Sequence, residues 1–253
     1  MKKGFTLAEV LITLGIVGVV ASMTLPTLNN NVQKQTYEAG AKKAFNIVSN
    51  AVSVYMVDQG VDDLSETPLR NNADGLKAFV NKYFRVATDC GKKYNSDTTA
   101  SCFSKELYSL NRSQTKDISK LDCAQVVTVA DGMAFCFENR ANKIFDTGRT
   151  QKLFNITDRV WEDVPITKKL STDTSQNFPL TVEVDINGAS GPNVVGRDVF
   201  YMLVASNGQV VSSTTKCDVS TQEKRDKCIE NYSKDASPMP IGLLQYYGWK
   251  MKY

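Results

Sequence analysis

The chain of 253 residues contains no histidine, and this absence removes most of the common catalytic and metal-binding arrangements. Without an imidazole there is no Ser-His-Asp or Cys-His nucleophile and no mixed cysteine and histidine zinc site. A Cys-x-x-Cys pair, a P-loop and a dinucleotide-binding fingerprint are also missing. The paired carboxylates of Asp62 and Asp63 lie in a polar stretch. We therefore expect a protein that is not an enzyme and requires no cofactor.

A strong excess of one charge is missing too. The 30 basic residues nearly balance the 27 acidic ones, which leaves a formal net charge of +3. Basic clusters such as Lys92-Lys93 and Lys168-Lys169 are short and typical of solvated surfaces. The charge pattern therefore does not indicate a nucleic-acid partner.

Long apolar runs are absent except for one, from Phe5 to Leu25. Its length is about the 20 residues that a helix needs to cross the hydrocarbon core of a bilayer. Lys2 and Lys3 precede it without an acidic residue, so the positive-inside rule places the N-terminus in the cytoplasm and the chain after about Leu28 outside. A secretory signal has a shorter apolar core of about 7 to 15 residues. We therefore expect a single-pass membrane protein with an exoplasmic head.

One carboxylate, Glu9, interrupts this apolar run. An ionised carboxylate in a membrane is costly and usually marks a functional site with a partner. Glu9 could also reach the cytoplasmic interface, where it would remain hydrated. The run itself contains no cationic residue. Cleavage between Gly4 and Phe5 would create a charged α-amino group on Phe5, and that group on a neighbouring subunit could pair with Glu9.

The sequence KKGFTLAE at residues 2–9, followed by the apolar run, resembles the class III signal of type IV pilins and type II secretion pseudopilins. The resemblance implies cleavage after Gly4 by a membrane aspartic peptidase, methylation of the new N-terminal Phe5, and a requirement for Glu9 in assembly. Pro26 falls where many family members carry a helix-kinking proline. The implied partners are the prepilin peptidase and methyltransferase, other pilin or pseudopilin subunits, and an inner-membrane assembly platform with its ATPase.

Gly15 and Gly18 lie within the apolar run, roughly on one helix face with Ala21 and Ser22. Small residues let helices approach closely in membranes, which would give these glycines a role in assembly. Glycine is also generally more frequent in transmembrane helices than in soluble ones. The sequence leaves both interpretations open.

Beyond Pro26 the apolar residues recur at steps of three and four, which predicts that the helix continues to about Gln59-Gly60. Its length would be about 55 residues, or roughly 80 Å. Three consecutive asparagines at 29–31 are weak helix formers and favour a loosening of the helix there. The residues of the apolar stripe are Tyr37, Ala41, Ala44, Phe45, Val48, Val52, Tyr55 and Met56.

The remaining residues, 61–253, predict one head domain with a short helix over 74–85 and several strands. Apolar segments 125–130 and 133–138 flank Asp131-Gly132, and segments 199–205 and 209–213 flank Asn207-Gly208, so each predicts a β-hairpin. Segment 181–186 alternates like a strand, and residues 160–161 indicate a short strand or turn. The expected fold class is α+β and pilin-like: a long N-terminal helix packed on an antiparallel sheet. The expected divisions are a leader (1–4), a transmembrane half-helix (5–28), an amphipathic half-helix (29–60) and the head (61–253).

All six cysteines lie on the predicted exoplasmic side, where disulfides can form. Their spacing groups them into three local pairs, and zinc binding is disfavoured because no histidine or Cys-x-x-Cys is available. The expected pairs are Cys90 with Cys102, Cys123 with Cys136, and Cys217 with Cys228.

Oxygen ligands and turn residues concentrate in the segment 185–198. Asp185, Asn187, Asn193 and Asp198 could bind calcium, which takes six to eight oxygens from carboxylates, amides and carbonyls. The EF-hand pattern is absent, and the same residues also suit a turn in which aspartate and asparagine bond their own backbone. The segment is similar to a block of many large bacterial pilin-like proteins, but it does not match the calcium loop of major pseudopilins residue by residue.

The C-terminal segment from Leu243 to Met251 is apolar and aromatic, and we expect it to cover the sheet or an edge strand rather than to form an exposed binding strip. Together these features predict a structural subunit of a type IV pilus or a type II secretion pseudopilus. It would lie in the inner membrane before assembly, and on the cell surface or in the periplasm afterwards. The alternative is a monomeric, membrane-tethered binding module that does not polymerise.

Overall fold

The computed structural model describes residues 6–69, 72–93, 102–104, 106–117, 122–139, 151–155, 160–164, 179–211, 221–234, 236 and 238–253. Gly4, Phe5 and Cys217 therefore lie outside the described residues. The chain divides into two compact units, Met1–Tyr37 and Glu38–Tyr253, and the second unit takes in the C-terminal part of the long helix.

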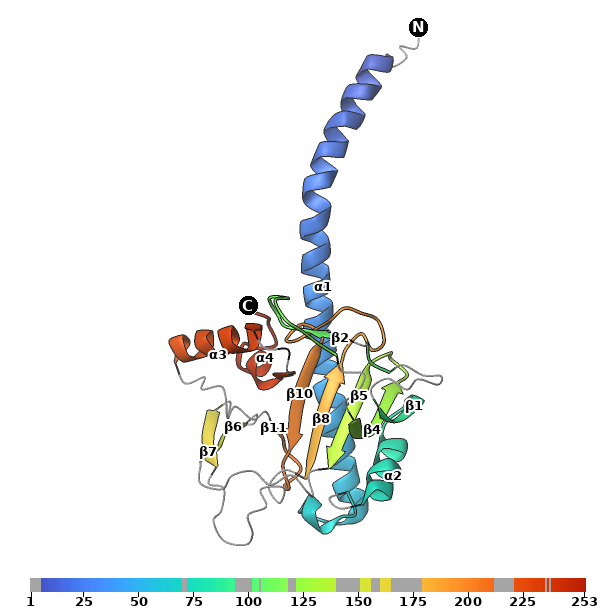
Figure 1. Cartoon of the computed structure of the whole chain (residues 1–253), viewed down its shortest axis with the longest axis vertical. Helices are drawn as coiled ribbons and strands as arrows, with labels where there is room; N and C mark the ends of the chain where they lie inside the picture. The colour runs from blue at the N-terminus through green and yellow to red at the C-terminus, as the bar shows by residue number, and fades with distance from the viewer. Residues whose placement is uncertain are drawn as a thin grey trace. The chain divides into compact units, whose positions relative to one another are not determined.

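Helix α1 spans Leu7–Gln59, 53 residues, in agreement with the predicted length (Figure 1). The helix continues through Pro26 and the asparagines at 29–31, so the expected loosening there is wrong. Asparagine lowers helix propensity only modestly, and the helical turns on both sides supply cooperative support. Gly60, with φ of 65°, ends the helix in a Schellman motif, because its N–H donates to the Val57 carbonyl and that of Val61 donates to the Met56 carbonyl.

A seven-stranded sheet forms the centre of the second unit, with the order β1-β4-β5-β8-β10-β11 (Figure 1). The seventh strand, β12, pairs with β10. All neighbours pair antiparallel except β12, which pairs parallel with β10. The fold is therefore α+β and pilin-like, as predicted. The strands are β1 (Val86–Lys93), β4 (Asp122–Val129), β5 (Ala134–Asn139), β8 (Leu180–Asp185), β10 (Val199–Val204), β11 (Val210–Val211) and β12 (Met239–Pro240).

Both predicted hairpins are confirmed. Strands β4 and β5 pair across Asp131-Gly132, where the φ of Gly132 is 85°, and β10 and β11 pair across Asn207-Gly208. A left-handed residue at these turns favours glycine, which explains why the dipeptides identify them. The strand expected at 181–186 is β8, and it lies between β5 and β10.

Smaller elements surround the sheet, and sequence periodicity finds only some of them. Helix α2 (Ala73–Tyr83) corresponds to the helix predicted over 74–85, and β7 to the strand signal at 160–161. The other elements are η1 (Leu64–Glu66), a second sheet of β3 (Thr115–Asp117), β2 (Glu106–Tyr108) and β9 (Asn193–Val194), a strand pair of β6 (Gln151–Asn155) with β7 (Val160–Val164), and helices α3 (Gln222–Lys234) and α4 (Gly242–Tyr246).

Aromatic rings join the C-terminal part of α1 to α2 and the sheet. Tyr55 of α1 contacts Phe79 of α2 with ring centroids 4.9 Å apart. Phe79 also meets Phe84 at 5.7 Å, and Phe84 meets Phe137 of β5 at 4.9 Å. Because these rings are buried, they form the part of the core that fixes α1 against the sheet.

The C-terminal segment packs on α1. The Glu38 carboxylate, which is buried, accepts hydrogen bonds from the Met251 N–H (2.8 Å) and from Lys250 Nζ (3.0 Å). Trp249 packs on Phe45 with ring centroids 5.5 Å apart. The expectation that this segment covers the sheet or an edge strand did not include α1, where a buried carboxylate needs donors and the C-terminal segment provides them.

Two of the expected disulfides, Cys90–Cys102 and Cys123–Cys136, are present. Cys123 and Cys136 tie β4 to β5 near the sheet centre. Cys228 is also disulfide-bonded, and the expected partner, Cys217, lies outside the described residues.

The ion pair between Asp58 and Lys82 joins the last turn of α1 to α2 and predicts a dependence on pH. Hydrogen bonds from Lys82 Nζ (2.9 Å) and from Tyr83 Oη (2.7 Å) lower the pKa of the Asp58 carboxyl. A lowered pKa contributes stability above the ordinary value near 4, and this contribution is lost as the pH falls through the folded-state value. We expect Asp58→Asn to lower the melting temperature by less than about 3 °C at pH 7 and by less still near pH 2. Calorimetric melts at both pH values check this, and an equal loss at both would contradict it.

Candidate functional site

The N-terminal part of α1 is an apolar surface with no cover inside its own compact unit. The window Leu7–Thr24 has a mean hydropathy of 2.0 and is long and apolar enough to cross a membrane. None of that window is buried within the described structure. Soluble proteins rarely expose a continuous apolar surface of this size, and such surfaces mark sites of contact with a membrane or with other proteins. The exposed large apolar residues are Leu7, Val10, Leu11, Ile12, Leu14, Ile16, Val17, Val19, Val20 and Met23.

Glu9, the one carboxylate on this surface, has a local partner at the start of the helix. Its Oε2 accepts hydrogen bonds from the Thr6 N–H (2.8 Å) and from Thr6 Oγ1 (2.7 Å), while its own N–H donates to Thr6 Oγ1 (3.3 Å). This reciprocal arrangement is a capping box, and the sequence signal for it, Thr-x-x-Glu, lies within residues 6–9. Sequence reasoning treated Glu9 only as an unpaired charge and missed Thr6.

Gly15 and Gly18 lie in the same exposed segment. A Cβ added at either position would meet no atom within 4 Å, so nothing inside the described chain requires glycine there. Any requirement for a small residue must therefore come from outside the subunit. Pro26 lies further along α1, and its side chain is outside the described part of the structure.

The predicted ligand residues of segment 185–198 lie together at one end of the sheet, where β8 ends and β10 begins. Asp185 pairs with Val199 across these strands, and the Ile186 N–H donates to the Asp198 carbonyl (2.9 Å). Asp198 Oδ1 accepts the Val194 N–H (2.6 Å), next to Asn193 in β9. The structure thus brings Asp185, Asn193 and Asp198 into one buried region.

Burial perturbs both carboxyl groups of this loop. It raises the pKa of Asp185 well above its ordinary value, and the nearby Asp198 carboxylate raises it further. Burial also raises the pKa of Asp198, to about 7. Asp185 Oδ1 nevertheless accepts the N–H groups of Asn187 and Gly188, each at 3.1 Å, so the predicted aspartate turn is present as well.

Metal clusters of the usual composition do not occur in the described part of the chain. No group of three or more aspartate, glutamate, cysteine or histidine side chains comes together there. The loop at 185–198 differs because it combines two carboxylates with amide oxygens, a donor set that suits hard cations.

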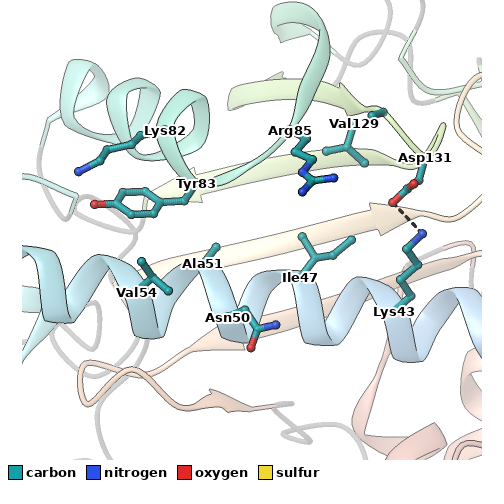
Figure 2. Close-up of a pocket in the computed structure, with 11 residues that line it drawn as sticks. Lys43, Ile47, Asn50, Ala51, Val54, Lys82, Tyr83, Arg85, Val129 and Asp131 are labelled. Atoms are coloured by element: carbon teal, nitrogen blue, oxygen red, sulfur yellow. Dashed lines mark ion pairs between the residues drawn. The ribbon is translucent and has the colours of Figure 1, made fainter.

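A cavity of about 560 Å³ lies between α1, the end of α2 and the β4–β5 turn (Figure 2). Lys43 Nζ and Asp131 Oδ2 form an ion pair at 2.8 Å on its wall, and Ile47, Ala51 and Val54 supply apolar surface. The lining has no serine or cysteine nucleophile with a neighbouring base. The lining therefore does not resemble a serine or cysteine nucleophile site.

Comparison with known proteins gives two matches. Residues 1–25 match the family described as Prokaryotic N-terminal methylation motif. The fimbrial protein EcpC of Eikenella corrodens is 36% identical over 84 residues, which cover 32% of this chain and 49% of that protein. The chain thus spans about half the length of the curated relative it matches. No solved structure matches significantly.

The N-terminal motif, the fimbrial relative and the α+β architecture confirm the predicted resemblance to the type IV pilin family. Residues 1–25 thus carry a prokaryotic N-terminal methylation motif, and about a third of the chain is similar to part of a fimbrial protein. Neither match is to an enzyme.

Proposed function

We propose that this protein is a polymerising subunit of a type IV pilus or a type II secretion pseudopilus. The main support for this proposal is the exposed apolar segment Leu7–Thr24, which has a single carboxylate, Glu9, in its first turns. Lipid covers this surface in the membrane, and the helices of neighbouring subunits cover it in a filament. The subunit therefore passes from one apolar environment to another without exposing the segment to water.

Processing supplies the cation that Glu9 lacks. Cleavage after Gly4 frees the Phe5 amino group, which a methyltransferase then modifies. The charged amino group of one subunit pairs with Glu9 of its neighbour, because each charge is unfavourable in an apolar environment without the other. The pair also sets the axial offset between adjacent helices.

The partners and location follow from this role. A prepilin peptidase and methyltransferase process the chain at the inner membrane, and an assembly platform with its ATPase lifts processed subunits into the polymer. Lys2 and Lys3 favour a cytoplasmic N-terminus and an exoplasmic head before assembly. The match to residues 1–25 supports this order of events, since that motif is a methylation motif.

Close helix packing in the polymer gives Gly15 and Gly18 their role. Because a Cβ at either position meets nothing within the subunit, Gly15→Leu and Gly18→Leu leave insertion and head folding unchanged. We expect each to reduce the filament yield by about tenfold, since bulky side chains separate helix backbones. Quantitative immunoblotting of sheared filaments measures the yield. The matched control is Val17→Leu in the same exposed segment, with an unchanged yield, and wild-type yields for both glycine variants would remove the packing role.

Processing distinguishes this proposal from a monomeric tethered module. Intact mass spectrometry of the protein from its native membrane should give a chain that lacks Met1 to Gly4 and carries one methyl group. A substitution of Gly4 should leave the leader in place. An uncut, unmethylated wild-type chain would favour the tethered module instead.

A further inference from the structure

The loop of residues 186–198 joins two buried carboxyl groups at the end of the sheet to which β8 points (Figure 1). Asp185 closes β8, and Asp198 immediately precedes β10. Neither carboxylate forms an ion pair with any side chain of the described residues. Two like charges in such a place need a proton or a cation to neutralise them.

Three side-chain oxygens of this loop are buried and accept no hydrogen bond of normal geometry from the described residues: Asp185 Oδ2, Asn187 Oδ1 and Asn193 Oδ1. Asn193 Nδ2 has none either, although the Asn193 side chain lies close enough to the Asp185 carboxyl to interact with it. Asp185 and Asn193 are both fully buried, so bulk water does not reach them. Buried polar atoms in native proteins nearly always have a partner, and where the protein itself supplies none, a bound water or ion often takes that place.

The backbone of the loop holds the Asp185 carboxylate in a defined orientation. The N–H groups of Asn187 and Gly188 both bind Oδ1, which leaves Oδ2 without a backbone hydrogen bond and without any other donor of normal geometry among the described residues. Gly188 has a φ of 60°, and a Cβ there would collide with the Gly132 carbonyl oxygen. The tight turn that orients Asp185 therefore requires glycine at this position.

We propose that the 186–198 loop, with Asp185, binds one calcium ion. The free side-chain oxygens of Asp185, Asn187 and Asn193 are its ligands, and the adjacent Asp198 supplies the second negative charge. Calcium suits this set because it accepts carboxylate and amide oxygens in irregular geometry, whereas magnesium demands a regular octahedron and retains its waters. Backbone carbonyls and water complete the six to eight ligands that calcium takes.

Calcium binding here would stabilise more than the loop itself. Strand β9, within the loop, pairs with β2, and the Tyr253 hydroxyl donates a hydrogen bond to the Gly196 carbonyl (2.9 Å). The loop is therefore hydrogen-bonded both to the second sheet, through β9, and to Tyr253, through the Gly196 carbonyl. An ion bound between Asp185 and Asn193 would stabilise the loop, the second sheet and the position of Tyr253 together.

The test uses the full chain in detergent micelles, stripped with EDTA and then titrated with CaCl₂ by calorimetry. We expect one ion per chain, a dissociation constant of about 10⁻⁴ to 10⁻³ M as in extracellular modules, and a higher melting temperature with calcium than with EDTA. Asp185→Asn should weaken binding at least tenfold. Asp131→Asn is the matched control because Asp131 is exposed and paired with Lys43, so its affinity should equal that of the wild type.

Wild-type protein that shows neither heat nor a change in melting temperature at about 10 mM calcium would overturn the proposal. Wild-type affinity in Asp185→Asn would also overturn it, and an equal response to MgCl₂ would overturn the choice of calcium. If Asp185→Asn does not fold, Asn187→Ala serves as the test variant instead, because Asn187 is the less buried ligand. We expect Asn187→Ala to bind calcium more weakly than the wild type. None of these measurements depends on polymerisation. A chain that does not bind calcium could still polymerise, and a chain that does not polymerise could still bind calcium, so the two proposals are tested separately.

Discussion

Glu9→Val is expected to insert into the membrane and to be cleaved normally but to enter filaments roughly 100-fold less often than the wild type. The substitution leaves the Phe5 amino group of the adjoining subunit without a counter-charge in an apolar environment. It also removes the axial offset that the ion pair imposes. Immunoblots of sheared filament and membrane fractions measure incorporation, and intact mass of the membrane fraction measures cleavage.

The capping box requires a control for this experiment, because valine also removes the hydrogen bonds to Thr6. Glu9→Gln keeps an acceptor for the Thr6 N–H, since glutamine also serves in capping boxes, but it lacks the charge. If the intersubunit ion pair matters, Glu9→Gln fails to assemble as Glu9→Val does. If the helix cap alone matters, Glu9→Gln assembles normally, and the charge role of Glu9 is wrong.

Phe79→Ala is expected to destabilise the head by about 3 to 5 kcal/mol. Phe79 is 1% exposed and contacts rings on α1, on α2 and before β1, so its loss leaves a cavity that rigid elements on several sides cannot close. For a unit of this size the melting temperature would fall by roughly 6 to 20 °C. Thermal melts followed by near-ultraviolet circular dichroism would measure the loss.

The matched control is Val57→Ala, also an apolar truncation near the end of α1. Val57 is 79% exposed, so its truncation leaves no cavity and should change stability by less than about 0.5 kcal/mol. Equal effects of the two variants would show that the ring cluster around Phe79 does not fix α1 to the sheet.

The features that the sequence predicted are those that depend on neighbours along the chain. The apolar run with Glu9 forms a helix that is long and apolar enough to cross a membrane. Asp131-Gly132 and Asn207-Gly208 define hairpins by their turn geometry. The pairing of Cys90 with Cys102 and of Cys123 with Cys136 also follows short spacing.

The elements that were missed depend on residues far apart in the sequence. Strand β9 has only two residues and exists because β2, more than eighty residues earlier, pairs with it. Helix α3 is mostly polar, and Cys228 and Tyr232 are its buried residues, so it has no apolar stripe to detect. The anchoring role of Glu38 was equally invisible, because its partners Lys250 and Met251 lie at the other end of the chain.

The candidate loop was predicted only in part for the same reason. Its composition suggested two alternatives, a calcium site or a self-bonded turn. The structure shows that the backbone N–H groups of the turn bind one oxygen of Asp185 and not the other. Which oxygen remains free depends on the backbone of Gly188 and its approach to Gly132, and composition alone does not determine that approach.

Chemical cross-linking of intact native cells determines whether the processed chain polymerises. Cells are treated with a bifunctional amine reagent and sheared, and the filament and envelope fractions are analysed by immunoblot and intact mass. We expect a ladder of multimers built from chains that begin at a methylated Phe5, in the filament fraction for a pilus and in the envelope for a pseudopilus. A monomer that retains Met1 to Gly4 in the envelope, with no ladder, would contradict this expectation.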